Sequence, residues 1–229
     1  MRRYQKPSLP FAFKIPLLSE KCRQGSEVEL SLVIAGAAIS RLDLFVSAVR
    51  LLFASPGIFR GWRLGTVEAA AGDGSRTVIP VGGAVAEFSS LPLLSFDELL
   101  SPGCAGCSRV TINFLTPLRL LHKGVPLREI EFSAVAGAIL RRTSSLAYYY
   151  GGEELAHDFK WLAERSREIS CRSSELRWVN RGGGLQGVEG EAVFSGELAE
   201  FIPFLTLGSR FNIGKGASYG MGSYSLVVG

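Results

Sequence analysis

The sequence has no long hydrophobic run, although 47% of its 229 residues are hydrophobic. Its apolar stretches, such as residues 28–38, are short and interrupted, well below the ~20 apolar residues that span a bilayer. The N-terminal segment MRRYQKPSLPFAFKIPLL begins basic, contains three prolines and offers no small-residue cleavage site, which argues against a signal peptide. We therefore expect a cytoplasmic protein, without membrane contact, that buries one or two ordinary cores.

Potential metal ligands are also scarce. Four cysteines, at positions 22, 104, 107 and 171, are too few to form a disulfide framework in a chain of this length. The CAGC segment (104–107) has the spacing of half a zinc site, but the chain has no second pair of this kind and only two histidines. Because structural zinc needs four ligands, we expect a small-residue loop here, with no metal and no cofactor.

Acidic residues are missing from two stretches of a chain whose net charge is +4. Residues 102–128 and 201–229 contain no Asp or Glu. The first stretch carries Arg109, Arg119, Lys123 and Arg128, and the second carries Arg210 and Lys215. Together they predict one cationic surface suited to a polyanion, with scattered solvated cations as the alternative.

The second half of the chain has the pattern of a ferredoxin-like domain. Residues 108–116 alternate as a half-buried strand, and apolar residues over 131–150 follow helical spacing. The following elements are a helix (156–169), two strands joined through RGGG (174–180 and 185–194), a helix (196–207) and a closing strand (219–228). Pro203 is expected to kink or end the last helix. The order strand, helix, strand, strand, helix, strand is the ferredoxin-like one.

The first half repeats part of this pattern. A strand (27–36), an amphipathic helix (40–55) and a glycine-containing basic turn into a strand (56–71) indicate an internal duplication. Residues 71–107 are interpreted as a linker with a short helical piece at 95–100. We expect an α+β protein with tandem ferredoxin-like domains: an abbreviated N-terminal one with its linker (1–100) and a C-terminal one (101–229).

The segment GSRFNIGKGASYGMGSYSL (208–226) places five glycines around one arginine and one lysine. It is not a nucleotide-binding P-loop, because the glycine spacing is one residue too long and Gly216 stands where that motif needs Ser or Thr. A flexible glycine turn is one alternative. The other is a loop whose bare backbone approaches a polyanion, with Arg210 and Lys215 supplying charge and Tyr219 stacking or donating a hydrogen bond.

This segment, with the preceding GEAVFSGELAEFIPFLTLG, strongly resembles the RAMP superfamily of CRISPR-associated proteins, in particular the C-terminal domain of the CRISPR repeat-RNA-processing endoribonucleases. VTINFLTPLRL (110–120) is similar to that domain's opening strand, and FSAVAGAILRRTSSLAYYYGG (132–152) to its arginine-bearing helix. LPFAFKIPL and GSEVELSLVIAG are similar to the family's N-terminal region. The resemblance covers nearly the whole chain and is stronger from residue 108.

The resemblance implies two ferredoxin-like domains that bind a CRISPR repeat RNA, often a hairpin, and cleave it without metal. The product commonly stays bound, with other CRISPR-associated subunits, in a larger effector complex. The residues expected to contact RNA or shape its site lie in the glycine loop, on the arginine-bearing helix and in the basic turn. They are Gly208, Arg210, Asn212, Gly214, Lys215, Gly216, Ser218, Tyr219, Gly220, Gly222, Arg141, Arg142, Arg119 and Lys123.

Metal-free cleavage through the 2′-OH needs a base, a cation for the phosphorane and an acid. His122, in RLLHKG, is our candidate base, with an exposed loop histidine as the alternative. Arg210 is the candidate cation and Tyr149 the candidate acid, although a tyrosine run on a helix also suits packing. His157 opens a helix and fits a surface role. The family's usual catalytic histidine, on the first N-terminal helix, has no counterpart here.

Two functions remain open at this point. One is a metal-independent endoribonuclease that matures CRISPR RNA and stays on its product. The other is a non-catalytic RNA-binding RAMP subunit of a CRISPR ribonucleoprotein.

Overall fold

A computed structural model describes residues 7–16, 25–55, 61–79, 91–95, 98 and 106–229. By its internal contacts the chain divides into two compact units, residues 1–36 with 100–229, and residues 37–99. The second unit thus ends where the expected N-terminal domain ends. The first 36 residues, however, group by contact with the C-terminal part, so the expected division at residues 1–100 and 101–229 remains a prediction.

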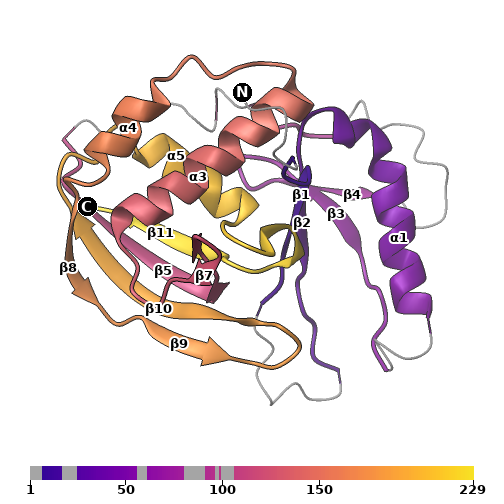
Figure 1. Cartoon of the computed structure of the whole chain (residues 1–229). Helices are drawn as coiled ribbons and strands as arrows, with labels where there is room; N and C mark the ends of the chain where they lie inside the picture. The colour runs from indigo at the N-terminus through magenta and orange to yellow at the C-terminus, as the bar shows by residue number, and fades with distance from the viewer. Residues whose placement is uncertain (1–6, 17–24, 56–60, 80–90, 96–97, 99–105) are drawn as a thin grey trace. The chain divides into compact units, whose positions relative to one another are not determined.

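The first unit is built on an antiparallel sheet in the order β11-β5-β10-β8, with β9 also paired to β10 (Figure 1). Its strands are β5 (Arg109–Leu118), β8 (Ser170–Ser174), β9 (Arg177–Asn180), β10 (Gln186–Ser195) and β11 (Tyr224–Val228). With β8 and β9 taken as one interrupted strand, the chain order and the sheet order are ferredoxin-like. The α+β fold class expected from the sequence is confirmed.

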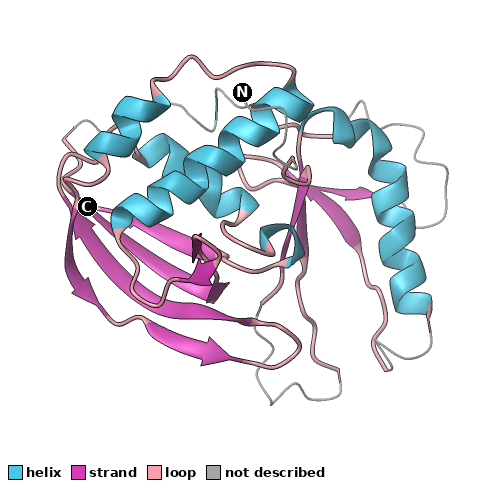
Figure 2. Cartoon of the chain, viewed as in Figure 1, coloured by secondary structure: helices cyan, strands magenta, loops and turns pink. Residues whose placement is uncertain are grey.

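Helices cover one face of this sheet (Figure 2). They are α3 (Phe132–Leu146), which continues into the π-helix η3 (Ala147–Gly151), then α4 (Phe159–Arg165) and α5 (Ile202–Phe211). Asp158 begins α4 by accepting hydrogen bonds from the N–H groups of Lys160 and Trp161, which have no partner inside the helix. The predicted helix at 131–150 is confirmed by α3 with η3, whereas the helix predicted at 156–169 is confirmed in type but is shorter, since α4 spans only Phe159–Arg165.

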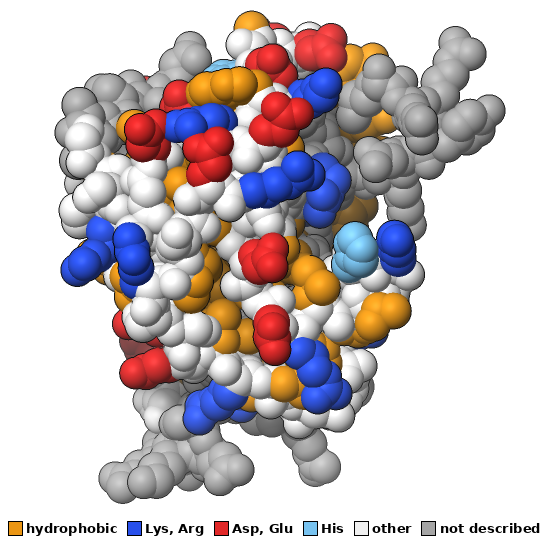
Figure 3. All heavy atoms as spheres, turned by 60° about the vertical axis from the view of Figure 1, so that its left-hand side comes forward, with side chains coloured by type: hydrophobic (Ala, Val, Ile, Leu, Met, Phe, Trp, Pro, Cys, Tyr) orange, Lys and Arg blue, Asp and Glu red, His pale blue; other side chains and the backbone are white. Residues whose placement is uncertain are grey.

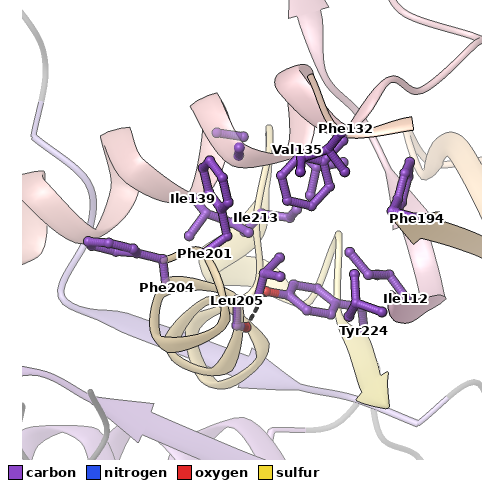
Figure 4. Packing of buried hydrophobic residues seen from close by; sticks show 14 of the residues in the cluster. Ile112, Phe132, Val135, Ile139, Phe194, Phe201, Phe204, Leu205, Ile213 and Tyr224 are labelled. Carbon is purple, nitrogen blue, oxygen red and sulfur yellow. Dashed lines mark hydrogen bonds between the residues drawn. The ribbon is translucent and has the colours of Figure 1, made fainter. Parts of the chain in front are cut away.

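The core lies between this sheet face and the helices (Figure 4). Val110, Ile112 and Phe114 are buried, as the alternation in β5 predicted. On the helical side, the ring of Phe132 from α3 meets the ring of Phe194 edge-on at 5.4 Å between centroids. The hydroxyl of the buried Tyr224 donates to the carbonyl of Leu205 at 2.6 Å, which fixes β11 to α5.

Pro203 does not kink the last helix. It lies in the first turn of α5, where a missing N–H costs nothing because that N–H would have no helical partner. The helix therefore starts six residues later than the pattern at 196–207 predicted and runs to Phe211, which places Gly208 and Arg210 on the helix itself.

Two short hairpins complete the first unit. One pairs β1 (Phe11–Lys14) with β2 (Ser31–Ile34), and β1 packs against α5 and the short helix η4 (Ala217–Tyr219) of the glycine loop. The other pairs β6 (Leu121–His122) with β7 (Val125–Pro126). The strand expected over 27–36 is confirmed by β2, whereas β1 was not predicted, since four residues flanked by prolines give too short a pattern.

The second unit contains α1 (Leu42–Ala54) and the hairpin of β3 (Val67–Ala70) with β4 (Arg76–Ile79); the 3-10 helix η1 (Gly36–Arg41) leads into α1. The predicted helix at 40–55 and the strand before residue 71 are confirmed. The linker expected over 71–107 is wrong at its start, because residues 76–79 form β4. The helical piece at 95–100 lies largely outside the described residues. None of the helices in the described part of the chain is both long and apolar enough to cross a membrane.

Candidate nucleic-acid interface

A pocket of about 360 Å³ in the first unit gathers four of the predicted RNA-binding cations. Arg119 follows β5, Arg141 and Arg142 lie on α3, and Lys215 comes from the glycine loop. Ser8, Leu120, Leu121, Ala138, Ser145, Tyr149 and Gly214 complete the lining. No carboxylate of the described residues lines the pocket, so the positive charges have no described counter-charge there. The two acid-free stretches of the sequence thus meet at one place, together with the arginine pair.

Arg142 is held in this pocket by three protein groups. Its Nε donates to the carbonyl of Phe211 at 2.9 Å, and its Nη2 donates to the carbonyl of Phe11 at 3.2 Å and to Ser218 Oγ at 3.3 Å. Burial lowers the pKa of Arg142 to about 10, so the guanidinium stays charged at neutral pH but is poorly hydrated. Arg142 therefore joins α3, β1 and the glycine loop, and it also contributes charge to the pocket wall.

Arg119 also lines this pocket. Its carbonyl accepts a hydrogen bond from the N–H of Lys215 at 2.9 Å, which fixes the glycine loop against the end of β5. Its side-chain Nε is buried without a hydrogen-bond partner among the described residues. A buried donor of this kind is costly unless an acceptor reaches it.

Close packing shapes the glycine loop. Gly222 has φ +63°, and a Cβ there would lie 1.9 Å from the carbonyl oxygen of Ile213. At Gly208, inside α5, a Cβ would lie 2.5 Å from the hydroxyl of Tyr224. The loop is therefore not a flexible turn. Side-chain-free positions let it fold against its own core as well as expose backbone.

Several predicted contact residues are used inside the protein. Asn212 is fully buried, and its Nδ2 donates to the carbonyls of Phe13 at 2.8 Å and Ala217 at 3.0 Å. Ser218 accepts from Arg142, and the carbonyl of the buried Gly220 accepts from Thr116 Oγ1 at 2.7 Å. These buried residues hold the shape of the loop. Gly214 and Gly216, in contrast, are only half-buried.

The exposed part of the loop consists of Arg210, Lys215 and Tyr219. The ring of Tyr219 meets Phe11 of β1 edge-on at 6.1 Å and is 65% exposed, which leaves much of it available to a partner. Lys14 of β1 donates through Nζ to the carbonyl of Ser209 near the end of α5. Burial, and then repulsion from Arg210, lower the pKa of Lys14.

The candidate base lies next to the pocket, not in its wall. His122 and Lys123 are exposed on the β6–β7 hairpin, where Lys123 has φ +49°, while the neighbouring Leu121 lines the pocket. Tyr149, the candidate acid, does line it. His157 is exposed beside α4, with its ring edge-on to Phe204 at 5.1 Å. No histidine lines the 360 Å³ pocket.

Sequence reasoning missed the contribution of the N-terminal strand. Ser8 lines the pocket and its N–H donates to Ser145 Oγ at 2.9 Å, Phe11 accepts from Arg142, and Lys14 adds a cation beside Arg210. The available signal was the resemblance of LPFAFKIPL to the family's N-terminal region. This resemblance did not show where a strand begins and ends or what it contacts.

Charged side chains are distributed differently outside the pocket. On the face that Figure 3 shows, on the side of β8, β9 and α4, acidic and basic side chains are interspersed, unlike the pocket lining. The described residues contain no group of three or more His, Cys, Asp or Glu side chains placed to hold a metal ion. Cys107, half of the CAGC pair, forms a disulfide and is buried, whereas Cys104 lies outside the described residues.

The fold and the pocket define a ferredoxin-like α+β protein with an acid-free cationic recess beside a packed glycine loop. Comparison with known families makes this class specific. Residues 112–224, within the C-terminal part of the chain, match the family model described as CRISPR-associated endoribonuclease Cas6. This match supports a CRISPR repeat-RNA-processing family for the chain. Among curated proteins, no sequence matches the chain.

Solved Cas6 structures share the fold. A chain of a partial Cas6-RT-Cas1–Cas2 complex matches with a TM-score of 0.63 at 14% identity, over 96% of this chain and 39% of that one. A Cas6 product complex (TTHB231, from Thermus thermophilus) matches with a TM-score of 0.55 at 21% identity, over 97% and 84%. A Cas6 (TTHA0078) substrate mimic complex gives 0.53 at 19%, over 95% and 85%. The chain thus spans about two fifths of the first match, and the likeness concerns the fold.

Proposed function

We propose that this protein binds CRISPR repeat RNA and cleaves it without metal, through attack of a 2′-OH on the adjacent phosphate, and that it stays on the product. The observation that carries the proposal is the pocket of four cations with no carboxylate, next to the glycine loop of a Cas6-family domain. Such a recess suits the phosphodiester backbone, whose contacts dominate the affinity of nucleic-acid complexes.

The proposed roles of the lining residues follow from where they lie, and those of Arg210 and His122, which lie outside the lining, follow from the sequence. Lys215 and Arg141 bind the backbone, and Arg142, dehydrated and fixed by three carbonyl and hydroxyl acceptors, raises the potential of the recess. Arg210 stabilises the charge that develops on the phosphorane. His122 serves as the base and Tyr149 as the acid for the departing 5′-oxygen, each contributing a factor of about 10²–10⁴.

Metal-free cleavage tests this proposal directly. The full chain is incubated with end-labelled repeat RNA in EDTA, and a discrete product that ends in a cyclic phosphate is expected. His122→Ala should slow single-turnover cleavage by about 10²-fold or more, while binding changes little because His122 is exposed on a hairpin. Normal cleavage by this variant would remove His122 from the mechanism, and uncut but tightly bound RNA would remove catalysis itself.

The second candidate is a non-catalytic RNA-binding subunit. It is favoured by one observation, that no histidine lines the cationic pocket. For both candidate functions we propose that the protein acts in the cytoplasm, together with other CRISPR-associated proteins. The solved relatives include a complex with reverse transcriptase, Cas1 and Cas2, and a multi-subunit effector complex is the partner that the family resemblance implies. Co-purification with the tagged chain tests this proposal. Recovery of CRISPR RNA and other protein subunits would indicate that the chain belongs to a complex, and recovery of the chain alone would indicate that it does not.

A further inference from the structure

The cationic pocket has the attributes of a built anion site. Arg119, Arg141, Arg142 and Lys215 line it without a carboxylate, and the Nε of Arg119 is buried without a partner among the described residues. Arg142 is held by its Nε and Nη2, so its position does not depend on a ligand. A group of four cations, one of them held in place and none facing a carboxylate of the described lining, suits an anion with several acceptor oxygens, as a phosphodiester has.

Exposed aromatic rings lie at the edge of the same pocket. The long helix α3 ends in the π-helix η3, an uncommon form that projects Tyr148 and Tyr149 in succession. The two rings meet edge-on at 5.1 Å, with 90° between their planes, and they are 45% and 40% exposed. Tyr149 also lines the pocket. An aromatic ring held by its neighbour and partly open to solvent offers a stacking surface next to the cations.

We propose, resting on the RNA-processing function above, that this pocket holds one unpaired nucleotide of the RNA, with its phosphate among Arg119, Arg141 and Lys215 and its base stacked on Tyr149. Inside a duplex the ring faces of each base are covered by its neighbours, whereas an unpaired base has a ring face that is free to stack on a side chain. Phosphate binding combined with base–aromatic stacking is the pattern of single-strand recognition. The site therefore reads a single-stranded segment of the repeat and not its hairpin stem.

Fluorescence of 2-aminopurine tests this site. A single-stranded heptaribonucleotide with 2-aminopurine at its centre is titrated with the full chain, and quenching on binding reports stacking. Tyr149→Leu should abolish the quenching and weaken binding about tenfold, whereas Tyr149→Phe should retain both. Arg141→Ala should weaken binding about five- to tenfold and lower the salt slope by about 0.7. Both side chains are exposed, so these variants are expected to fold.

Lys160→Ala is the matched control, because Lys160 is an exposed cation on α4 that does not line the pocket. Its affinity for the heptamer should stay within about twofold of the wild type. As a competitor, a blunt hairpin of equal length should displace the heptamer at least about tenfold less effectively than the unlabelled single strand.

Two results would overturn the site. They are an equally effective blunt hairpin, or unchanged quenching and affinity in both Tyr149→Leu and Arg141→Ala. Cleavage of repeat RNA by the same preparations separates the two levels of the argument. If wild type cuts repeat RNA while both variants bind the heptamer like wild type, the single-strand site is wrong and the proposed function stands. If wild type binds neither the heptamer nor repeat RNA, the proposed function fails with it.

Discussion

The protein has two glycine-rich segments next to basic residues, and they differ in almost every structural respect. Residues 181–184, RGGG, turn the chain between β9 and β10, and a Cβ at Gly182, Gly183 or Gly184 would meet no atom within 4 Å. In the C-terminal loop, a Cβ at Gly222 would lie 1.9 Å from a backbone oxygen. The first segment needs glycine only for its backbone conformation, and the second needs it also for space.

The charges of the two segments differ in the same way. Arg181 donates through Nε to the carboxylate of the buried Glu189 at 2.9 Å, and hydrogen bonds and attraction from Glu189 raise the pKa of Arg181. In the C-terminal region burial lowers the pKa of Arg142 to about 10, and burial with repulsion from Arg210 lowers that of Lys14. A satisfied cation has little to offer a ligand, whereas uncompensated cations favour an incoming anion.

The largest expected effect concerns stability. Gly222→Ala adds both strain at φ +63° and a collision with the carbonyl of Ile213, so it should lower the free energy of unfolding by about 3 kcal/mol or more. Gly183→Ala, at φ +58° in open space, should cost only about 1–2 kcal/mol. Urea denaturation of both variants measures the difference. Equal costs would mean that the C-terminal loop is not closely packed.

The next effect concerns RNA affinity. The double variant Arg210→Ala/Lys215→Ala removes two exposed cations from the loop and should weaken binding of repeat RNA about tenfold at 0.15 M salt. The slope of log affinity against log salt should fall by about 1.4, about 0.7 for each lost contact with single-stranded RNA. Arg181→Ala serves as the control and should leave both quantities unchanged, since its cation is paired. If Arg181→Ala weakened RNA binding as much as the double variant does, the two glycine-rich segments would not differ in their contribution to RNA binding.

The smallest effect is a pH dependence of stability. Because the pKa of folded Lys14 lies below its ordinary 10.5, the unfolded state binds more protons between the two values, and this group stabilises the fold increasingly as pH rises through that window. The free energy of unfolding of wild type, minus that of Lys14→Met, should therefore rise between pH 8 and pH 10.5. A difference that stays flat across this range would show that neither burial nor Arg210 lowers the pKa of Lys14 in the folded protein.

Much of the C-terminal fold was predictable because its signals are local. Alternation in β5, helical spacing in α3 and the RGGG turn each depend on neighbours along the chain. The failures have local causes too. Pro203 is compatible with either a kink or a helix start, and β1 and β4 are only four residues long, too short for a period to show. For the candidate site, the pocket brings together Arg119, Arg141, Arg142 and Lys215, whereas Arg210, Lys123 and His122 lie outside its lining, and the RNA-binding and catalytic roles of all these residues stay predictions.

The amino-acid sequence by itself determined the order of most elements, the acid-free stretches and where the glycines lie along the chain. The tertiary structure alone decided which cations are paired and which are not, because Arg181 finds Glu189 across a hairpin while Arg119, Arg142 and Lys215 converge from segments far apart in the chain. Charge compensation depends on distances of a few ångströms in space, and no spacing along a sequence fixes those distances.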